Sequence, residues 1–293
     1  MSDRREAVEE LKAMGYSERS ACDAADIWCS THRYAPVEPN PFRDEARLAA
    51  IRLSKEHRRL GYRKITVLMR REGFPVNPKR IQGIRSRADL AVPRKRPRKR
   101  RYGTGWERPQ TATHRNHVWT YDFTFDLTEY GLRLKLLTLL DEYTRESLVI
   151  QVEKRIDSGV LIETLDRLIA EHGAPEYIRS DNGPEFIAEK LQRWLAAKGT
   201  KTTHIDPGSP WQNGFIENFN GRLKDECVSR ELFWSRGEAQ VIVEKWRRWY
   251  NTGRPHGALD YRTPAEVAGC PGGLPSATLR ESPQGMDSYG HRN

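Results

Sequence analysis

Three acidic residues, Asp122, Asp181 and Glu217, are candidates for one shared metal site. Carboxylates that converge repel one another, and bound divalent cations relieve that repulsion. Two Mg²⁺ ions suit such a site, because Mg²⁺ takes oxygen ligands and keeps positions for water and phosphate. One ion would activate a water or a DNA 3′-hydroxyl, and the other would stabilise the leaving oxygen. The three residues therefore predict in-line displacement at a phosphodiester, without a covalent protein intermediate.

The two aspartates lie in or beside expected strands. Asp122 is inside the apolar run Val118 to Leu127, where a buried carboxylate is expensive unless a partner neutralises it. Asp181 follows a short strand expected over 176–179, and α/β sheets place functional groups at strand ends. The alternative for Asp181 is structural, because an Asp-Asn-Gly sequence is typical of a turn that caps the next helix.

Glu217 lies on a helix expected to begin near Asn213. Helical spacing places the apolar residues of this segment on one face, and these are Phe215, Ile216, Phe219 and Leu223. Glu217 and Lys224 share a different, polar edge with Gly214 and Gly221, where a bulky substrate could approach the backbone. Taken alone, this Glu and Lys would be solvated residues of an amphipathic helix, so the functional interpretation depends on the two aspartates.

Other possible ligands are less favoured. Asp126 shares the strand parity of Asp122, Asp141 is better interpreted as a turn residue between strands, and His204 is a candidate for a DNA contact. The four cysteines are scattered, which indicates ordinary reduced thiols. A metal site of Cys22, Cys29 and His32 is rejected because it lacks a fourth ligand nearby.

The net charge of +10 is concentrated in one segment. Residues 43–101 contain 21 Lys or Arg and 5 Asp or Glu, a balance of +16, so the rest of the chain carries −6. This segment is a candidate for binding a polyanion, whereas the remainder is typical of an ordinary, slightly acidic enzyme.

The basic segment has the pattern of a helix-turn-helix. Helices are expected over 44–57 and 63–72, and Asn77 caps a third helix that has Pro78 at its first position. The expected DNA-binding residues are Lys79, Arg80 and Arg85 on that helix, followed by the arm Arg94, Lys95, Arg96, Arg98, Lys99, Arg100 and Arg101. A solvated helix face is the alternative for the helix, but the arm has no acidic residue to offset it, which favours phosphate binding with counterion release.

The remaining pattern predicts an α/β fold. Three consecutive strands over 118–127, 132–140 and 146–152 imply an antiparallel meander, and helices and strands then alternate up to two final helices over 213–230 and 236–251. The resulting order, βββαβαβαα, is that of a ribonuclease-H-like mixed sheet with helices on both faces.

The domain boundaries follow from these patterns. We expect five regions: a helical pair at 1–35, an all-α helix-turn-helix region at 43–92, a basic linker arm at 93–110, the ribonuclease-H-like core at 111–268, and a disordered tail at 269–293. No apolar run approaches the length of a membrane span, and the N-terminus lacks a signal peptide, so the sequence predicts a cytoplasmic protein with no membrane partner.

Three segments carry a family resemblance. They are Tyr121-Asp122-Phe123, Ser180-Asp181-Asn182-Gly183-Pro184-Glu185-Phe186 and Trp211-Gln212-Asn213-Gly214-Phe215-Ile216-Glu217-Asn218-Phe219-Asn220-Gly221-Arg222-Leu223-Lys224. They resemble the DDE core of retroviral integrases and, more closely, the second-frame (OrfB) transposases of bacterial insertion sequences. Asp181 and Glu217 are separated by 35 residues, as in the D,D(35)E pattern of this family. The resemblance extends over residues 15–268, through Gly61-Tyr62-Arg63-Lys64, Asn77-Pro78-Lys79-Arg80, Tyr250-Asn251 and Arg254-Pro255-His256.

The resemblance implies a transposase that cleaves element ends and transfers the 3′-hydroxyl to target DNA. It implies that Asp122, Asp181 and Glu217 bind Mg²⁺ or Mn²⁺ and that Lys224 contacts double-stranded DNA. It also implies a partner protein or fusion from an upstream frame, while the pairing of two DNA ends leads us to expect a homo-oligomer. Two alternatives stay open: a non-catalytic repressor that binds its own element, and an RNA-cleaving ribonuclease H.

Overall fold

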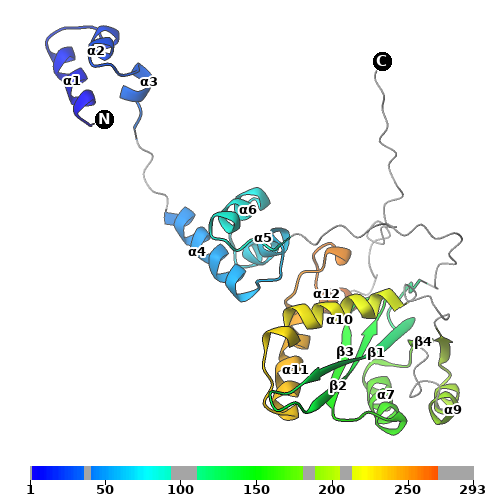
Figure 1. Cartoon of the computed structure of the whole chain (residues 1–293). Helices are drawn as coiled ribbons and strands as arrows, with labels where there is room; N and C mark the ends of the chain where they lie inside the picture. The colour runs from blue at the N-terminus through cyan, green and yellow to red at the C-terminus, as the bar shows by residue number, and fades with distance from the viewer. Residues whose placement is uncertain (1, 36–40, 94–110, 181–188, 205–212, 270–293) are drawn as a thin grey trace, which may run out of the picture. The chain divides into compact units, whose positions relative to one another are not determined.

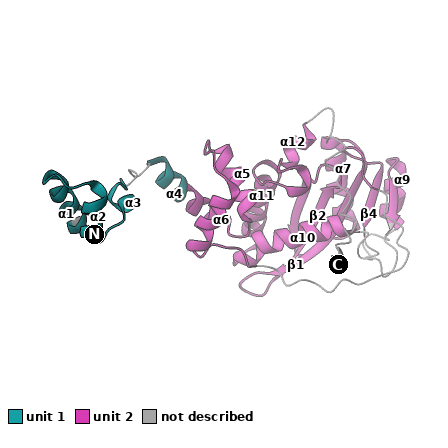
Figure 2. Ribbon diagram, turned by 90° about the horizontal axis from the view of Figure 1, so that it is seen from above, with its two compact units in different colours: residues 1–47 teal, residues 48–293 magenta. Residues whose placement is uncertain are grey.

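The structure is a computed structural model that describes residues 2–35, 41–93, 111–180, 189–204 and 213–269. The chain divides into two compact units, residues 1–47 and 48–293, shown in separate colours in Figure 2. The boundary falls within helix α4 (Pro41–Glu56), and the two units are described separately below.

The first unit is a small helical assembly of α1 (Ser2–Ala13), α2 (Glu18–Ala24) and α3 (Cys29–His32). Ser17 caps α2, because its hydroxyl accepts a hydrogen bond from the amide of Ser20. Cys22 and Cys29 are free thiols. The ring nitrogens of His32 lie 2.9 Å from a carboxylate oxygen of Glu9 and 3.3 Å from one of Glu18, so this side chain connects α3 with α1 and α2.

The helix-turn-helix region of the second unit contains the end of α4, then α5 (Tyr62–Arg71) and α6 (Pro78–Arg87). Asn77 caps α6 as predicted, since its side chain accepts a hydrogen bond from the amide of Lys79 at 2.9 Å. The helices pack on buried apolar side chains, namely Leu53, Leu60, Ile65, Met69, Ile81 and Ile84.

A five-stranded mixed sheet forms the centre of the second unit (Figure 1). Its strands are β1 (Val118–Leu127), β2 (Arg133–Asp141), β3 (Ser147–Glu153), β4 (Tyr177–Ser180) and β5 (Lys201–His204), in the order β3-β2-β1-β4-β5. The first three strands form the predicted antiparallel meander, while β4 runs parallel to β1 and β5 runs parallel to β4. The predicted ribonuclease-H-like architecture is therefore confirmed.

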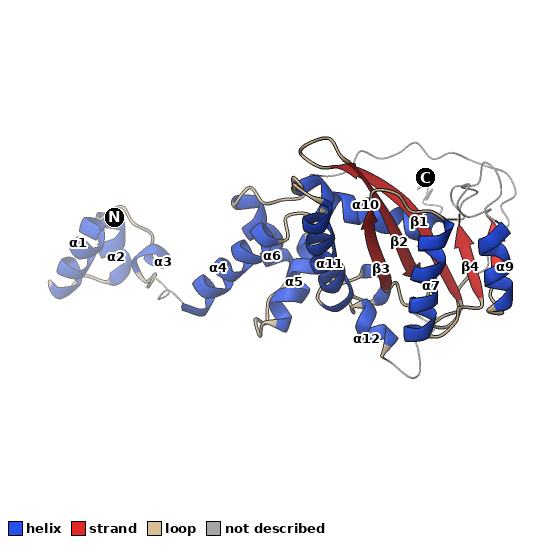
Figure 3. Cartoon of the chain, turned by 90° about the horizontal axis from the view of Figure 1, so that it is seen from below, coloured by secondary structure: helices blue, strands red, loops and turns tan. Residues whose placement is uncertain are grey.

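Helices cover both faces of the sheet (Figure 3). On one face, α7 (Ser158–His172) and α9 (Glu189–Ala197) enclose a core with Tyr121, Leu137 and Leu139. On the other face, α10 (Gly214–Glu226) and α11 (Arg236–Thr252) enclose a second core with Leu136 and Ile150. Alternate residues of one strand thus serve different cores, as the period of two requires.

The helix expected over 213–230 is shorter than predicted. It ends at Glu226, because Cys227 has φ −127° and ψ −76°, and the 3-10 turn η2 (Val228–Arg230) follows. The structure also contains η3 (Gly257–Leu259) and α12 (Pro264–Ala268), which begins with a capping box between Thr263 and Glu266. None of the helices in the described residues has the length and apolarity that crossing a membrane requires.

Candidate active site

Asp122 lies in the middle of β1, on the sheet face covered by α10. Its side chain is half-buried, and its Oδ1 accepts a hydrogen bond from the amide of Phe123 at 2.7 Å. Its Oδ2 accepts a second bond, at 2.9 Å, from the side-chain amide of Asn220 on α10. The carboxylate is therefore held in a fixed orientation between the strand and the helix.

Asn220 is itself positioned by the sheet. Its Oδ1 accepts a hydrogen bond from the hydroxyl of Thr138 at 2.9 Å, and Thr138 stands directly opposite Asp122 in the β1–β2 ladder. The Thr138 side chain is fully buried, and its hydroxyl also lies 3.1 Å from the carbonyl oxygen of Asp122. Thr138, Asn220 and Asp122 thus form a hydrogen-bonded relay, which sequence analysis did not find.

A second polar contact fixes the start of α10. The Thr120 hydroxyl donates to Oδ1 of Asn213, the N-terminal cap position of the helix, at 2.6 Å. Asn213, Glu217, Asn220 and Lys224 recur at spacings of four, three and four residues, so they form one stripe along α10. Glu217 and Lys224 are exposed on this stripe, as predicted for a polar edge, and two other members of the stripe bond β1.

Asp181 lies outside the described residues. The strand before it, β4, is described up to Ser180, and its parallel ladder with β1 pairs Thr120 with Arg179. Asp122 and Asp181 each follow this pair by two residues along their own chain segments.

A buried ion pair anchors β4 close to this position. The guanidinium of Arg179 donates to both carboxylate oxygens of Glu142, at 2.6 and 2.8 Å, and both side chains are almost completely buried. Burial raises the pKa of Glu142 to about 7, although the charge of Arg179 opposes this shift. The pair joins the end of β4 to the turn after β2, and it was not predicted because its partners are 37 residues apart in the chain.

The other acidic candidates have separate roles or positions. Asp141 is the last residue of β2 rather than a turn residue, and its side chain holds the turn that follows by accepting hydrogen bonds from the amides of Asn116, Tyr143 and Thr144. Asp126 lies opposite Leu134 near the far end of β1, and His204 is the last residue of β5.

Sequence analysis missed a second cluster of possible ligands. The ligand atoms of His114, His117 and Glu176 lie within 4.8 Å of one another, beside the first residues of β1 and β4. Nδ1 of His117 accepts a hydrogen bond from the amide of Thr113 at 3.0 Å, so the neutral ring carries its proton on Nε2, the nitrogen that faces Glu176. The cluster forms a polar contact at the start of β4, where Nε2 of His114 lies 3.1 Å from a carboxylate oxygen of Glu176.

The structure separates the predicted DNA-binding residues into two groups. Lys79 is exposed and Arg80 is half-buried at the start of α6. Arg85 is a correction: its side chain is only 2% exposed, and its guanidinium donates to the carbonyl oxygens of Leu60 and Leu90. It links α6 to the turn before α5 and to the segment that follows α6, and it is not available to DNA. The basic arm from Arg94 to Arg101 lies outside the described residues.

Family models and solved structures show what this chain is similar to. Two models described as integrase core domain match residues 112–210 and 198–264, and a model described as HTH-like domain matches residues 41–98. Human T-lymphotropic virus 2 integrase catalytic core, solved in complex with magnesium, aligns with a TM-score of 0.43 and 19% identity over 53% of this chain and 97% of that one. A simian T-cell lymphotropic virus intasome aligns with a TM-score of 0.49 and 18% identity, covering 84% and 80%.

Proteins of bacterial insertion elements are more similar in sequence. The insertion element IS407 uncharacterized 31.7 kDa protein of Burkholderia multivorans is 38% identical over 86% of this chain and 90% of its own length. The insertion element IS476 uncharacterized 39.2 kDa protein of Xanthomonas euvesicatoria is 36% identical, with coverage of 90% and 76%. The transposase for IS904 of Lactococcus lactis is 28% identical, with coverage of 72% and 88%. The chain therefore belongs to the insertion-element transposases of the integrase superfamily.

Proposed function

We propose that this transposase cleaves DNA strands at the ends of its insertion element and joins the freed 3′-hydroxyl to target DNA. The observation that carries the proposal is the hydrogen bond from Asn220 to Asp122 at 2.9 Å. It fastens α10 to β1 by the same helical stripe that carries Glu217, which supports a shared site for Asp122 and Glu217. Asp181, the third acidic residue, comes directly after β4 in the sequence.

The described carboxylates fit a hard divalent cation. Asp122 is oriented by hydrogen-bond donors, and Glu217 is exposed with no ion-pair partner among the described residues. Oxygen ligands of this type suit Mg²⁺ or Mn²⁺. With Asp122, Asp181 and Glu217 as ligands, two bound ions would activate the attacking oxygen and stabilise the leaving one.

The reaction has two displacements at phosphorus. In the first, a water oxygen bonds to phosphorus and the bond from phosphorus to the 3′-oxygen breaks, which leaves a 3′-hydroxyl on the element after proton uptake. In the second, that hydroxyl loses its proton, bonds to a phosphorus of target DNA and displaces the 3′-oxygen there. Neither displacement needs a covalent protein intermediate.

Cationic residues would hold the DNA for these steps. Lys224 projects from the same stripe of α10 as Glu217, seven residues further on, and is positioned to contact a phosphate beside the reacting bond. Lys79 and Arg80 on α6 and the basic arm would bind the backbone of the element end. A homo-oligomer that pairs two ends, and a partner protein from an upstream frame, complete the proposed assembly in the cytoplasm.

The test is Mg²⁺-dependent cleavage and joining of a labelled duplex that bears the element's own end. We expect activity in the wild type and none in Asp122→Asn or Glu217→Gln. Asp126→Asn is the matched control, since it removes a carboxylate from the same strand and face. Equal cleavage by the wild type and Glu217→Gln would refute the catalytic assignment. If the wild type, like the variants, binds DNA but does not cleave it, the result would favour the repressor alternative or a requirement for the upstream-frame partner.

A further inference from the structure

A small cavity beside α10 has a strongly cationic lining. Its volume is about 140 Å³, and it is lined by four Lys or Arg side chains and by no carboxylate. The lining residues that matter here are Lys64, Arg145, Arg222, Arg254, Phe215 and Asn218. Asn218 is the neighbour of Glu217, so the cavity adjoins the proposed catalytic stripe.

The four cations come from four different elements. Lys64 belongs to α5 and Arg222 to α10, whereas Arg145 lies in the turn between β2 and β3 and Arg254 follows α11. Two of the four belong to the motifs Gly61-Tyr62-Arg63-Lys64 and Arg254-Pro255-His256, which the triad chemistry does not use. The fold therefore brings motifs about 190 residues apart to one cavity, where their side chains would otherwise only repel one another.

Within the described part of the chain, Glu226 is the carboxylate that pairs directly with this group. Glu226 accepts hydrogen bonds from Arg254 at 2.8 and 2.6 Å, and it lies 4.0 Å from Arg222. Nearby Glu142 is paired with Arg179, and Asp141 with backbone amides. Among the described residues, Lys64 has no ion-pair partner.

The contacts of Arg145 are a second, independent observation that supports an anion site in this cavity. Its guanidinium carbon lies 3.6 Å from the centroid of the Phe215 ring, so its plane is held against the wall of the cavity. Its Nη1 is buried and has no hydrogen-bond acceptor among the described residues. A buried donor of a charged group without an acceptor is costly, and an oxyanion in the cavity would supply the acceptor.

The pKa values of two side chains that line the cavity reflect the same excess of positive charge. Burial first, and then the charges of Arg254 and Arg222, lower the pKa of Lys64 to about 7. Burial and the neighbouring Arg254 lower the pKa of His256 to about 2, so this histidine is neutral. Bound anionic charge would reverse the effect on Lys64 and hold it protonated.

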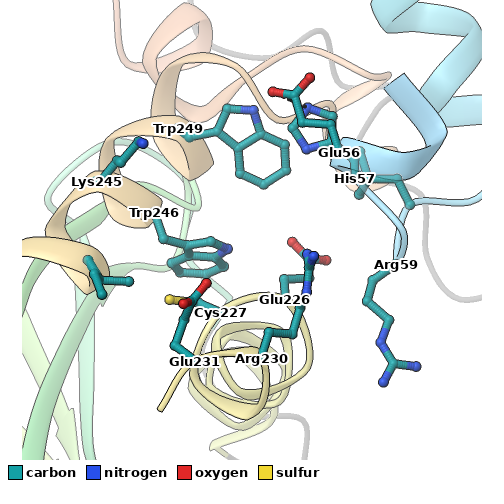
Figure 4. Close-up of a pocket in the computed structure, with 12 residues that line it drawn as sticks. Glu56, His57, Arg59, Glu226, Cys227, Arg230, Glu231, Lys245, Trp246 and Trp249 are labelled. Atoms are coloured by element: carbon teal, nitrogen blue, oxygen red, sulfur yellow. Dashed lines mark ion pairs between the residues drawn. The ribbon is translucent and has the colours of Figure 1, made fainter. Parts of the chain in front are cut away.

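A neighbouring cavity serves as an internal comparison (Figure 4). It is larger, about 520 Å³, and its lining places Glu56 and Glu231 beside Arg59, Arg230 and Lys245, together with Glu226, the carboxylate that also pairs with Arg254. Its cations therefore have carboxylates within the same lining, and it has no need of an added anion.

We propose that the cavity of Lys64, Arg145, Arg222 and Arg254 binds one phosphate group of the DNA backbone next to the reacting strand. The ligand class is a phosphate oxyanion. Arg and Lys donors would bind it in a cavity whose lining contains no carboxylate. The choice of DNA as its source rests on the proposed function. This phosphate would connect α5 of the helix-turn-helix region with the catalytic helix α10, so that both regions bind the same DNA.

The test measures DNA binding by the full chain in EDTA, so that no cleavage is required. The affinity for the element-end duplex is determined over a range of salt for the wild type, Lys64→Met, Arg222→Gln and the control Lys245→Gln. Each lost phosphate contact reduces the slope of log affinity against log salt by about 1. We expect that reduction in Lys64→Met and Arg222→Gln and an unchanged slope in Lys245→Gln.

A second measurement separates the phosphate site from a structural role. In phosphate-free buffer, the melting temperature of Lys64→Met is expected to exceed that of the wild type, because the substitution removes a charge that its neighbours repel. Added inorganic phosphate is expected to raise the melting temperature of the wild type and not that of Lys64→Met. Unchanged slopes in Lys64→Met and Arg222→Gln would overturn the proposal. Stabilisation by inorganic phosphate with unchanged slopes would assign the cavity to a free anion and overturn the DNA assignment. Both measurements are independent of cleavage, so a failure of the catalytic proposal is distinguishable.

Discussion

Replacement of Asn220 by Ala tests how the orientation of Asp122 contributes to metal binding. The change removes the donor 2.9 Å from Oδ2 of Asp122 and leaves the Phe123 amide on Oδ1. A hydrogen bond to an ionised group contributes about 1.5–3 kcal/mol. With about 1.4 kcal/mol per tenfold change, this corresponds to a roughly 10- to 150-fold weaker affinity for Mg²⁺ if the bond acts through Asp122. Removal of partners that orient metal ligands has effects of about this size.

The assay is the Mg²⁺ concentration that gives half-maximal cleavage of the element-end duplex. We expect this concentration to rise roughly 10- to 150-fold in Asn220→Ala, with DNA affinity in EDTA unchanged. Thr138 provides a paired control one step away: Thr138→Ser keeps the hydroxyl that donates to Asn220, whereas Thr138→Val removes it. Serine is expected to resemble the wild type, and valine is expected to shift the Mg²⁺ dependence in the same direction as Asn220→Ala.

Two outcomes would refute this reasoning. A wild-type Mg²⁺ dependence in Asn220→Ala would mean that Asp122 keeps its orientation without the amide. A lower stability with no change in Mg²⁺ dependence would assign Asn220 to the attachment of α10 alone.

Three further predictions concern single side chains. Arg85→Met leaves the Leu60 and Leu90 carbonyls without this donor, so urea denaturation should show that the free energy of unfolding falls by about 1–3 kcal/mol. Lys79→Ala should weaken DNA binding without a comparable loss of stability. Asp141→Ala should lower the melting temperature but leave the Mg²⁺ dependence of cleavage unchanged, because Asp141 bonds backbone amides. The pKa of Lys64 is lowered from 10.5 to about 7, so between these pH values the unfolded chain binds one more proton than the folded chain. The stability of the wild type relative to Lys64→Met should therefore rise with pH in this range. Equal pH profiles of stability would contradict this prediction.

The elements that sequence analysis predicted well have strong local patterns. The bounds of β1 and the start of α11 agree with the expectation because apolar periodicity defines them. The end of α10 was predicted less well, since Cys227 leaves the helix without a glycine or proline to mark the change. The short helix α12 was missed although Thr263, Pro264 and Glu266 carry a capping box.

The site was predictable in its residue types and not in its supporting contacts. Asp122 and Glu217 stand out by strand parity and helical spacing, but their link through Asn220 spans 98 residues and depends on the register of β1 with β2. Arg85 illustrates the opposite problem: its spacing matches a basic helix face, while tertiary packing turns it toward two carbonyl groups. Charge in a sequence does not distinguish an arginine that binds DNA from one that satisfies buried backbone.

The placement of β1 at the centre of the sheet also determines when the site forms during synthesis. The β1–β2–β3 meander uses neighbouring segments, so its loops close at little entropic cost once β3 has left the ribosome. The contacts of Asp122 are completed only after β4 and then Asn220 of α10, 98 residues further along the chain, have been synthesised. A nascent or prematurely terminated chain that ends before α10 carries the DNA-binding helices and an aspartate without Glu217. Under the proposed function, strand cleavage requires a chain that has been synthesised at least through α10.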